Sequence, residues 1–274
     1  MEIREPRWRR ALVTGASAGI GAAISDQLAG DGTHLILVAR DRERLREQAA
    51  RLRREHDVEV DIAAADLSNP DDIVEVTRKI GDQWTLDLLV NNAGIGSVGL
   101  FHQQSMAAET AQIELNVLAL VHLTHAAIPQ MVAAGHGTIM NMSSLSARLP
   151  SPRNAVYGAT KAFVTSFSES LHTELRDTGV TVTAVMPGAV RTEFQQRVGE
   201  HAFDHVPERA WMDADTVAAS ALGAAARGDV LHLPGRKYQA MAGAAQLMPR
   251  ALLRTLARRT APGQTSTRPG GTGN

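Results

Sequence analysis

Apolar and polar residues are arranged in blocks along this chain. From residue 10 onward, short runs of apolar and β-branched residues are separated by longer segments in which apolar residues recur every three or four positions. Short, continuously apolar runs are typical of strands buried on both faces, and the longer pattern is typical of amphipathic helices. The predicted strands are residues 11–14, 34–39, 58–63, 86–91, 137–142, 180–186 and 229–233.

Helical patterns fill five of the intervals between these strands. Strands that alternate with helices predict a parallel sheet with helices on both faces. We therefore expect an α/β fold of the Rossmann-like, doubly wound type, with a mostly parallel seven-stranded sheet. The predicted helices are residues 23–32, 43–56, 70–83, 106–135 and 155–179.

Domain organisation follows from the continuity of the pattern. Neither a repeat nor a Pro/Ser-rich linker interrupts residues 8–233, so we expect one domain for residues 1–274 with its core in that range. Residues 189–213 are bulky and aperiodic, which suggests a substrate lid of loops or short helices. Residues 235–260 show an apolar and basic helical pattern. We interpret it as a packing or subunit-contact extension, with membrane-surface contact as the less favoured alternative.

Composition narrows the classes of function. With 28 basic and 29 acidic residues the net charge is −1, which gives no reason to expect a nucleic-acid partner. The absence of cysteine excludes disulfides and thiolate metal sites and is compatible with a reducing cytoplasm. No apolar stretch approaches the roughly 20 residues that span a bilayer, so we expect a soluble, cytoplasmic protein. Residues 261–274 are rich in Gly, Thr and Pro and are expected to be disordered.

Two histidine pairs have spacings that a metal could use. His122 and His125 lie in an apolar predicted helix, where a packed histidine is the commoner finding, and His201 and His205 lie in the lid. We expect no metal site at either pair.

A glycine-rich turn follows the first predicted strand. In VTGASAGIGAAI, Gly15 permits a sharp turn, and Gly19 and Gly21 remove side chains where a pyrophosphate and the neighbouring strand come close. The amino end of the following helix then faces the anion. The alternative is a turn that only joins strand to helix. The candidate cofactor contacts here are Gly15, Ser17, Gly19, Ile20 and Gly21.

Arg40 stands at the tip of the second predicted strand. An acidic residue at this position suits a free ribose 2′-hydroxyl, whereas an arginine suits a 2′-phosphate. Arg40 therefore favours NADP(H) over NAD(H), although Asp41 follows it directly. The alternative is an ordinary surface arginine.

Tyr157 and Lys161 are four residues apart in a chain with two tyrosines and three lysines. On a helix this spacing puts both side chains on one face. A nearby ammonium lowers the pKa of a phenol, so the pair can act as acid and base on an alcohol or carbonyl oxygen. Ser144, thirteen residues before Tyr157, follows a predicted strand and could hold the same oxygen. Ser143 is the adjacent rival, and either serine could instead cap the turn.

The chain resembles the short-chain dehydrogenase/reductase family, in its single-domain form. Seven motifs occur in the family's order across residues 10–233. They are TGASAGIG (14–21), Asp66-Leu67, NNAG (91–94), Asn116, the serine pair 143–144, YGATK (157–161) and PGAVRT (187–192).

The resemblance implies roles for these residues. Ser144, Tyr157 and Lys161 would form the catalytic set, with Asn116 holding a water through which Lys161 exchanges protons with solvent. One departure concerns Ala18, because many NADP-preferring relatives carry a basic residue there, which leaves Arg40 to supply the preference. The implied cofactor contacts also include Asp66, Leu67, Asn92, Ala93, Gly94, Pro187, Gly188, Val190 and Thr192, together with Tyr157 and Lys161.

These observations predict an NADP(H)-dependent oxidoreductase that transfers a hydride between nicotinamide and a carbonyl or secondary alcohol. Apolar residues in the lid and beside Ser144 suggest a moderately hydrophobic substrate. Two alternatives remain, which are a non-catalytic NADP-binding regulator of the same fold and an epimerase or dehydratase that retains its cofactor. The resemblance also implies a homodimer or homotetramer. The residues behind the substrate prediction are Leu145, Leu149, Pro150, Phe194, Phe203, Val206, Trp211 and Met212.

Overall fold

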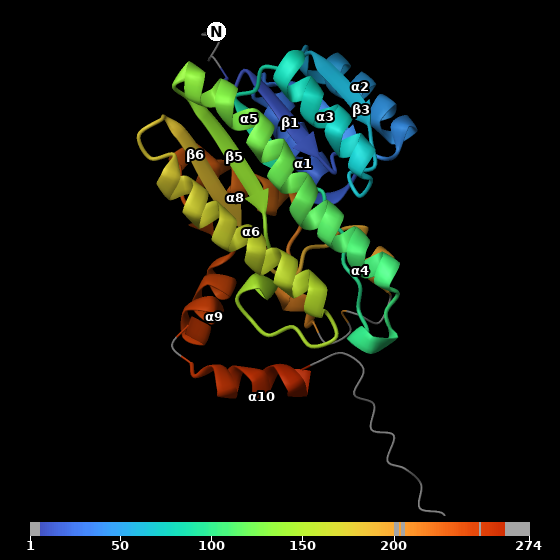
Figure 1. The fold of residues 1–274 in the computed structure, drawn as a ribbon. Helices are drawn as coiled ribbons and strands as arrows, with labels where there is room; N and C mark the ends of the chain where they lie inside the picture. The colour runs from blue at the N-terminus through green and yellow to red at the C-terminus, as the bar shows by residue number, and fades with distance from the viewer. Residues whose placement is uncertain (1–5, 200–202, 204–205, 247, 261–274) are drawn as a thin grey trace, which may run out of the picture.

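Strands in the order β3-β2-β1-β4-β5-β6-β7 form one sheet in which every neighbouring pair is parallel (Figure 1). The computed structural model describes residues 6–199, 203, 206–246 and 248–260, so the predictions for His201, His205 and residues 261–274 lie outside the described residues. The doubly wound fold predicted from the sequence is confirmed. The strands are β1 (Arg10–Thr14), β2 (His34–Ala39), β3 (Val60–Ala64), β4 (Leu88–Asn91), β5 (Gly137–Met142), β6 (Val180–Val185) and β7 (Leu231–His232).

Helices cover both faces of the sheet. One layer packs α1 (Gly19–Gly30), α2 (Arg42–His56) and α8 (Ala214–Arg227) on one hydrophobic cluster, and the other packs α3 (Pro70–Asp82), α5 (Leu120–Ala134) and α6 (Ala155–Glu174) on the second face. Each fully buried Leu or Ile contributes about 1.5–3 kcal/mol through burial. The apolar blocks of the sequence are therefore the two-sided core of the sheet.

The chain reverses its winding between β1 and β4, which are neighbours in the sheet although two strands separate them in sequence. At such a point the connections leave the sheet in opposite directions and open a crevice at the carboxyl ends of the strands. The Gly15 turn follows β1, the residues 92–94 follow β4, and Ser144 follows β5 shortly after its end. The topology thus gathers most of the predicted motifs at one edge.

Helix α8 is an element that the sequence analysis does not assign. Its sequence ADTVAASALGAAAR consists mostly of alanine and small residues, and Val217 and Leu222 are its only larger apolar residues, so it lacks the recurring large apolar side chains that mark the predicted helices. The capping residues Asp213 and Gly228 were the signal in the sequence that could have predicted this helix. In the structure the Asp213 carboxylate accepts from the Thr216 N–H at 2.7 Å, and Gly228 ends the helix with φ of 73°.

The predicted helix 106–135 is one continuous run made of α4 (Met106–Ile113), a π-helical segment (Glu114–Ala119) and α5. By length and composition this run is apolar enough to cross a membrane, contrary to the expectation from the sequence. Its α5 part instead packs against α3 and the second hydrophobic cluster. The same test is passed by core helices of soluble proteins, so it is weak support for a membrane span.

Several boundaries differ from those predicted. Strand β3 begins two residues later, β7 is reduced to two residues at the edge of the sheet, and α6 ends at Glu174 rather than at 179. Where it is described, the 189–213 segment is irregular as predicted, with α7 (Phe194–Val198) and a 3₁₀ turn (Glu208–Ala210). The C-terminal extension forms α9 (Arg236–Gln246) and α10 (Arg250–Thr260), and Pro249 lies between them.

Candidate active site

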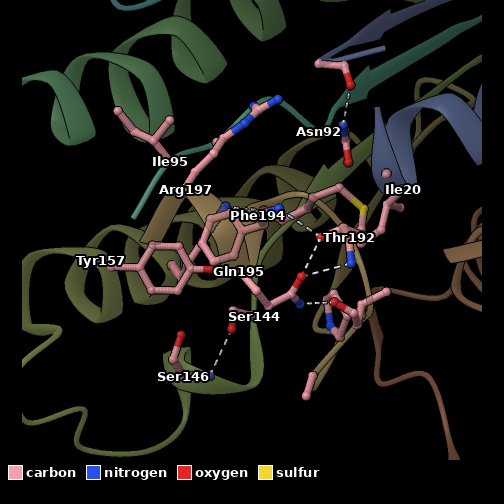
Figure 2. A pocket seen from close by; sticks show the side chains of 18 of the residues that line it. Ile20, Asn92, Ile95, Ser144, Ser146, Tyr157, Thr192, Phe194, Gln195 and Arg197 are labelled. Atoms are coloured by element: carbon pink, nitrogen blue, oxygen red, sulfur yellow. Dashed lines mark hydrogen bonds between the residues drawn. The ribbon is translucent and has the colours of Figure 1, made fainter. Parts of the chain in front are cut away.

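A cavity of about 1180 Å³ runs along the carboxyl edge of the sheet, from the glycine turn to the lid. Every predicted site residue lines it except Gly21 and Asn116. Figure 2 shows Tyr157, Ser144 and Phe194 grouped at one end, with Ile20 and Asn92 at the other. The structure therefore brings residues from the whole length of the predicted motifs into one crevice.

The glycine turn has the geometry of an anion cradle. Gly15 and Gly19 have φ of 64° and 56°, a left-handed conformation that favours glycine. A Cβ on Gly21 would lie 2.3 Å from the carbonyl oxygen of Gly15, so only glycine lets α1 start this close to β1. The first turn of α1 carries no acidic residue, and its N-cap makes no side-chain hydrogen bond. Its N–H groups and positive helix end fit a pyrophosphate.

Asn92 fixes the turn from the neighbouring strand. Its Nδ2 donates to the Thr14 carbonyl oxygen at 2.9 Å, and the Asn92 and Ala93 N–H groups both donate to the Thr14 hydroxyl at 2.9 Å. Asn92 lines the cavity as predicted, but its amide braces β1 against β4. The sequence thus predicted the position of Asn92 at the cavity but not its hydrogen bonds to Thr14.

Arg40 lies at the cavity end where an adenosine would reach the tip of β2. Its side chain is 59% exposed, and its nearest carboxylate is Asp66, with 3.9 Å between Nη1 and Oδ2. Burial opposes the ionisation of Asp66, but hydrogen bonds from Ser68 and the charge of Arg40 lower the pKa of this carboxyl below its usual value. A weak, exposed pair leaves the Arg40 guanidinium available to a 2′-phosphate.

An ion pair joins the two lips of the cavity and was not anticipated from the sequence. Arg44 of α2 donates to both carboxylate oxygens of Glu193, at 2.8 and 2.9 Å. Arg197 donates to Glu193 at 2.8 Å. The Arg44 contact attaches the beginning of the lid to α2, and the Arg197 contact lies within the lid and gives Arg197 a partner. The i,i+4 spacing of Glu193 and Arg197 was the only local signal.

The two candidate serines point to different surroundings. The Ser143 hydroxyl is buried and donates to the Lys161 carbonyl oxygen at 2.8 Å, next to the Thr165 hydroxyl at 2.8 Å. The Ser144 hydroxyl accepts from the Ser146 N–H at 3.2 Å (Figure 2), and a hydrogen-bond interaction with this hydroxyl opposes the rise that burial causes in the pKa of Tyr157. The geometry thus places Ser144, and not Ser143, beside Tyr157.

Lys161 lies below the Tyr157 ring, with its Nζ 5.7 Å from the ring centroid. The amine is 5% exposed and donates to the Met142 carbonyl oxygen at 2.8 Å. Burial lowers the pKa of Lys161 to about 8. Burial likewise raises the pKa of Tyr157, and the hydrogen bond with Ser144 offsets part of that rise.

These directions correct the expectation that the lysine lowers the pKa of the phenol. The expectation assumed a permanently charged ammonium in contact with the hydroxyl. In the structure the amine bonds the backbone of Met142, and desolvation weakens its own charge. The spacing of four residues predicted the shared face correctly but not the electrostatics.

Asn116 lies in the π-helical segment, a local widening that is frequent at functional sites. Its amide is fully engaged: Oδ1 accepts from the Ile95 N–H at 3.0 Å, and Nδ2 donates to the Ile95 carbonyl oxygen at 2.9 Å and to the Thr160 hydroxyl at 3.1 Å. Asn116 thereby holds the Ile95 segment, which lines the cavity, against α6. Its predicted role in a water relay stays a prediction.

The segment 187–192 lines the cavity between the glycine turn and the loop that carries Ser144. The Pro187 carbonyl oxygen accepts from the Leu145 N–H at 3.0 Å, which ties this segment to the loop that carries Ser144. The Thr192 N–H donates to Gln195 Oε1 at 2.9 Å, and Gln195 Nε2 donates to the Val190 carbonyl oxygen (Figure 2). The first turn of α7 thus stabilises the segment from the lid side.

Aromatic rings connect the lid to Tyr157. Phe194 packs on Tyr157 with ring centroids 5.8 Å apart, and Phe203 continues the series to Trp211. Phe194, Phe203 and Val206 line the cavity as predicted, whereas Trp211 and Met212 lie behind its wall. The lid therefore presents apolar side chains directly beside the candidate acid.

Tyr238 of α9 is a lining residue that the sequence analysis missed. Its hydroxyl donates to the Ala210 carbonyl oxygen at 2.7 Å and accepts from the Ala189 N–H at 3.1 Å. Its ring lies so close to Gly188 that a Cβ there would be 2.1 Å from Cζ. Tyr238 joins the C-terminal extension, the lid and the 187–192 segment at one point. Tyr238 is one of only two tyrosines in the chain, which could have singled it out. The sequence analysis instead interpreted the C-terminal extension as a packing or subunit-contact element.

Tyr238→Phe is expected to raise the KM for a bulky ketone about fivefold while kcat stays within about twofold. The variant keeps the ring and loses two hydrogen bonds of about 0.5–1.5 kcal/mol each, so the lid would be positioned less well for substrate. Steady-state kinetics measure this split. The matched control is Thr178→Val, in the turn before β6, whose hydroxyl also donates once and accepts once. Equal loss of stability in both variants with KM unchanged would contradict the positioning role.

Comparisons with known proteins agree with this arrangement. A family model described as short chain dehydrogenase matches residues 9–202. The NADP-dependent 3-hydroxy acid dehydrogenase YdfG of Escherichia coli O6:H1 is 40% identical over 187 residues, which are 67% of this chain and 73% of the relative.

Solved structures are similar over a larger share of the chain. A short-chain dehydrogenase from Sphingobium yanoikuyae in complex with NADPH superposes with a TM-score of 0.79 at 38% identity, covering 86% of this chain and 93% of its own. The bulky-bulky ketone specific alcohol dehydrogenase from Comamonas testosteroni superposes with a TM-score of 0.75 at 33% identity, covering 89% and 96%.

The glycine cradle, the exposed Arg40 and these relatives agree on the cofactor, which is NADP(H). A family model that matches most of the chain, a fold shared with NADPH-bound members and the grouped motifs lead to one conclusion: the protein belongs to the short-chain dehydrogenase family of oxidoreductases.

Proposed function

We propose that this protein reduces a neutral, largely apolar ketone or aldehyde to the alcohol, reversibly, with Tyr157 as the acid and base. The observation that carries the proposal is the grouping of Tyr157, its hydrogen-bonded partner Ser144 and the buried Lys161 in the same cavity as the glycine cradle. A module that only binds a dinucleotide has no use for a phenol and an amine at the opposite end of its crevice.

The chain's own residues supply positioning and protons. When bound, NADPH supplies the hydride for the carbonyl carbon. In this proposal Ser144 donates a hydrogen bond to the carbonyl oxygen, and Tyr157 gives that oxygen its proton as negative charge develops there. Because burial raises the pKa of Tyr157, the phenol is protonated at neutral pH, which suits the direction of reduction.

Lys161 and Asn116 belong to the proton supply in this proposal. With a pKa lowered to about 8 by burial, the Lys161 amine can both give and accept a proton near neutral pH. It lies on the same face of α6 as Tyr157. A Cβ on Gly94 would lie 3.2 Å from Asn116 Oδ1 and 3.4 Å from Lys161 Nζ, so both polar groups border the same glycine. This supports a route from Lys161 toward Asn116.

The lining of the substrate end supports a neutral substrate. Among the described lining residues there, the cations are Arg197, which donates to Glu193, and Lys161, whose buried amine donates to the Met142 carbonyl oxygen, so both already have partners. Arg40 and Arg44 lie at the adenosine end. A 3-hydroxy acid, named for the Escherichia coli relative, would bring a carboxylate without a free partner, whereas a bulky ketone, named for the Comamonas structure, would meet apolar side chains. They include Leu149, Pro150, Phe194, Phe203, Val206 and Met241.

A panel of carbonyl compounds with NADPH, followed at the nicotinamide absorbance, tests the function. We expect kcat/KM for ketones with two apolar substituents to exceed that for small 3-hydroxy acids in the reverse assay with NADP⁺. NADPH binding without turnover across the panel would favour a regulator. Conversion of an alcohol substrate with no net change in the nicotinamide would favour an epimerase or dehydratase.

Arg40→Asp is expected to weaken NADPH binding by at least about tenfold more than NADH binding. The substitution removes a charge-assisted contact to the 2′-phosphate and adds repulsion, while a carboxylate there can accept from the free 2′-hydroxyl of NADH. Fluorescence titration of each cofactor measures the two dissociation constants. Arg42→Asp is the matched control because Arg42 is exposed and lies outside the cavity lining. Equal losses for both cofactors would contradict the role of Arg40.

We also propose that the protein is a homodimer or homotetramer in the cytoplasm. Apolar side chains are exposed on the long helical run and on α6, among them Leu118, Val132 and Phe163, and Phe163 stacks on Phe167 at 5.8 Å. Exposed apolar helix faces of this kind are typical of subunit contacts. Sedimentation velocity of the purified protein measures the oligomeric state. The absence of cysteine is compatible with a reducing compartment.

A further inference from the structure

A second cavity, of about 360 Å³, lies outside the catalytic crevice. It is open to solvent and is bordered by α10, the first two turns of α6 and the loop that follows β5, which are neighbours in Figure 1. Its polar lining is dominated by three arginines: Arg148 from the loop, and Arg250 and Arg254 from α10. The α6 wall consists of small residues, so guanidinium groups set the character of this cavity. Those small residues are Ala155, Gly158, Ala159 and Ala162.

No carboxylate balances these three charges in the described part of the chain. None of the three side chains takes part in an ion pair there, and no acidic residue lines the cavity. The sequence explains why: residues 115–168 and residues 230–274 contain neither Asp nor Glu, and the cavity is built from these two segments. Arg250 and Arg254 are also one turn apart on α10, a spacing at which like charges repel. The site holds an excess of positive charge that no carboxylate among the described residues compensates.

Unpartnered polar atoms in the same wall are an independent observation. The Ser146 hydroxyl and the Arg148 Nε are both buried without a hydrogen-bond partner, and both residues line the cavity. A buried donor without a partner is costly, so such atoms indicate a missing ligand or water. Water can satisfy the hydroxyl and the Nε, whereas an oxyanion satisfies them and also pairs with Arg148 and with the exposed Arg250 and Arg254.

We propose that this cavity binds a small oxyanion of the phosphate class, held by Arg148, Arg250 and Arg254 with the Ser146 hydroxyl as a further donor. Guanidinium groups present paired N–H donors that match the oxygens of such an anion. The site is distinct from the cofactor's phosphate sites, which lie at the glycine turn and Arg40.

An anion bound in this cavity would affect the catalytic crevice, because the two cavities share lining residues. Ser146, Leu149, Pro150 and Ser151 line both cavities, and Ala257 of α10 lines the catalytic one. An anion that attaches α10 to the loop therefore stabilises one side of the substrate pocket. We expect phosphate to lower the KM for the carbonyl substrate and leave kcat nearly unchanged.

Thermal unfolding of the NADPH-saturated protein tests the proposal, because saturation fills the cofactor's own phosphate sites. Inorganic phosphate is added at constant ionic strength, with chloride as the reference salt. We expect the midpoint to rise with phosphate in the wild type, and the apparent dissociation constant for phosphate to increase at least about tenfold in Arg148→Gln and in Arg254→Gln. Arg176→Gln is the matched control, since Arg176 is exposed in the turn between α6 and β6. It should respond to phosphate as the wild type does.

A second experiment distinguishes a free phosphate ion from a lipid headgroup as the ligand of this site. Vesicles of phosphatidylcholine with or without phosphatidylglycerol are sedimented with the protein. Arginine-dependent binding to the anionic vesicles that free phosphate displaces would identify a lipid headgroup as the ligand of the same site. A phosphate response without vesicle binding would identify the free ion.

Two results would overturn the proposal. The first is an equal response to phosphate and chloride, or one that persists in both arginine variants, because the ion would then act elsewhere or through the surface in general. The second is a change of oligomeric state in Arg148→Gln or Arg254→Gln without any phosphate effect. In that case a carboxylate from a second copy of the chain is the partner of the arginines.

Discussion

Tyr157→Phe is expected to lower kcat for ketone reduction by about 10³-fold while NADPH binds within about twofold of its wild-type affinity. The substitution removes the proton donor and little else, because the ring still packs on Phe194 at 5.8 Å and against Gly96. Loss of a positioned general acid costs about 10² to 10⁴ in rate, and the buried, protonated phenol of this structure places the expected loss within that range.

Single-turnover oxidation of NADPH by a bulky ketone measures the loss at the chemical step. The comparison is Tyr238→Phe, which removes the other phenol of the chain from the same cavity. Its effect should appear in KM and stay within about tenfold in kcat/KM. If Tyr157→Phe retained a third or more of the wild-type rate, the acid would have to be sought in another group.

Lys161→Met is expected to abolish the supply of protons to Tyr157 and, at the same time, to make the cofactor-free protein more stable at neutral pH by up to about 3 kcal/mol, less the cost of the lost hydrogen bond to Met142. Burial lowers the pKa of Lys161 from 10.5 to about 8, so the folded state holds the charged amine at a cost. A methionine of similar length fills the same space without a charge, although it leaves the Met142 carbonyl oxygen without its donor.

The difference in stability between Lys161→Met and the wild type is expected to depend on pH. Between about pH 8 and 10.5 the unfolded lysine stays protonated while the folded one is neutral, so the unfolded state binds more protons and wild-type stability rises with pH. The difference between variant and wild type should therefore be largest below pH 8 and shrink toward pH 10.5. Denaturant unfolding at several pH values measures it, with Lys79→Met on the surface of α3 as control. A difference that does not change with pH would show that Lys161 titrates normally.

Most of the fold was predictable because its determinants are local or periodic. Strands β2 and β5 match the prediction at both ends, since a buried strand between two helical layers must be continuously apolar whatever packs on it. Helix α8 was missed for the opposite reason. Its alanines suit a helix, but only Val217 and Leu222 supply larger apolar side chains, so the recurring apolar pattern that marked the other helices is missing.

The place of the site was also contained in the sequence. The glycine turn, the serine pair and the Tyr157–Lys161 spacing are short motifs, and parallel topology brings the carboxyl ends of β1, β4 and β5 to one edge. Once these strands were recognised, the motifs at their ends had to meet.

Only the tertiary structure decided what each group does within the site. It directs the Ser143 hydroxyl into α6 and Ser144 toward Tyr157, it lowers the pKa of Lys161 instead of that of the phenol, and it brings Tyr238 across from the C-terminal extension. These properties depend on burial and on contacts between residues far apart in the chain. Periodicity and motif spacing describe neighbours along the sequence, whereas desolvation and hydrogen bonding depend on what surrounds a side chain after folding.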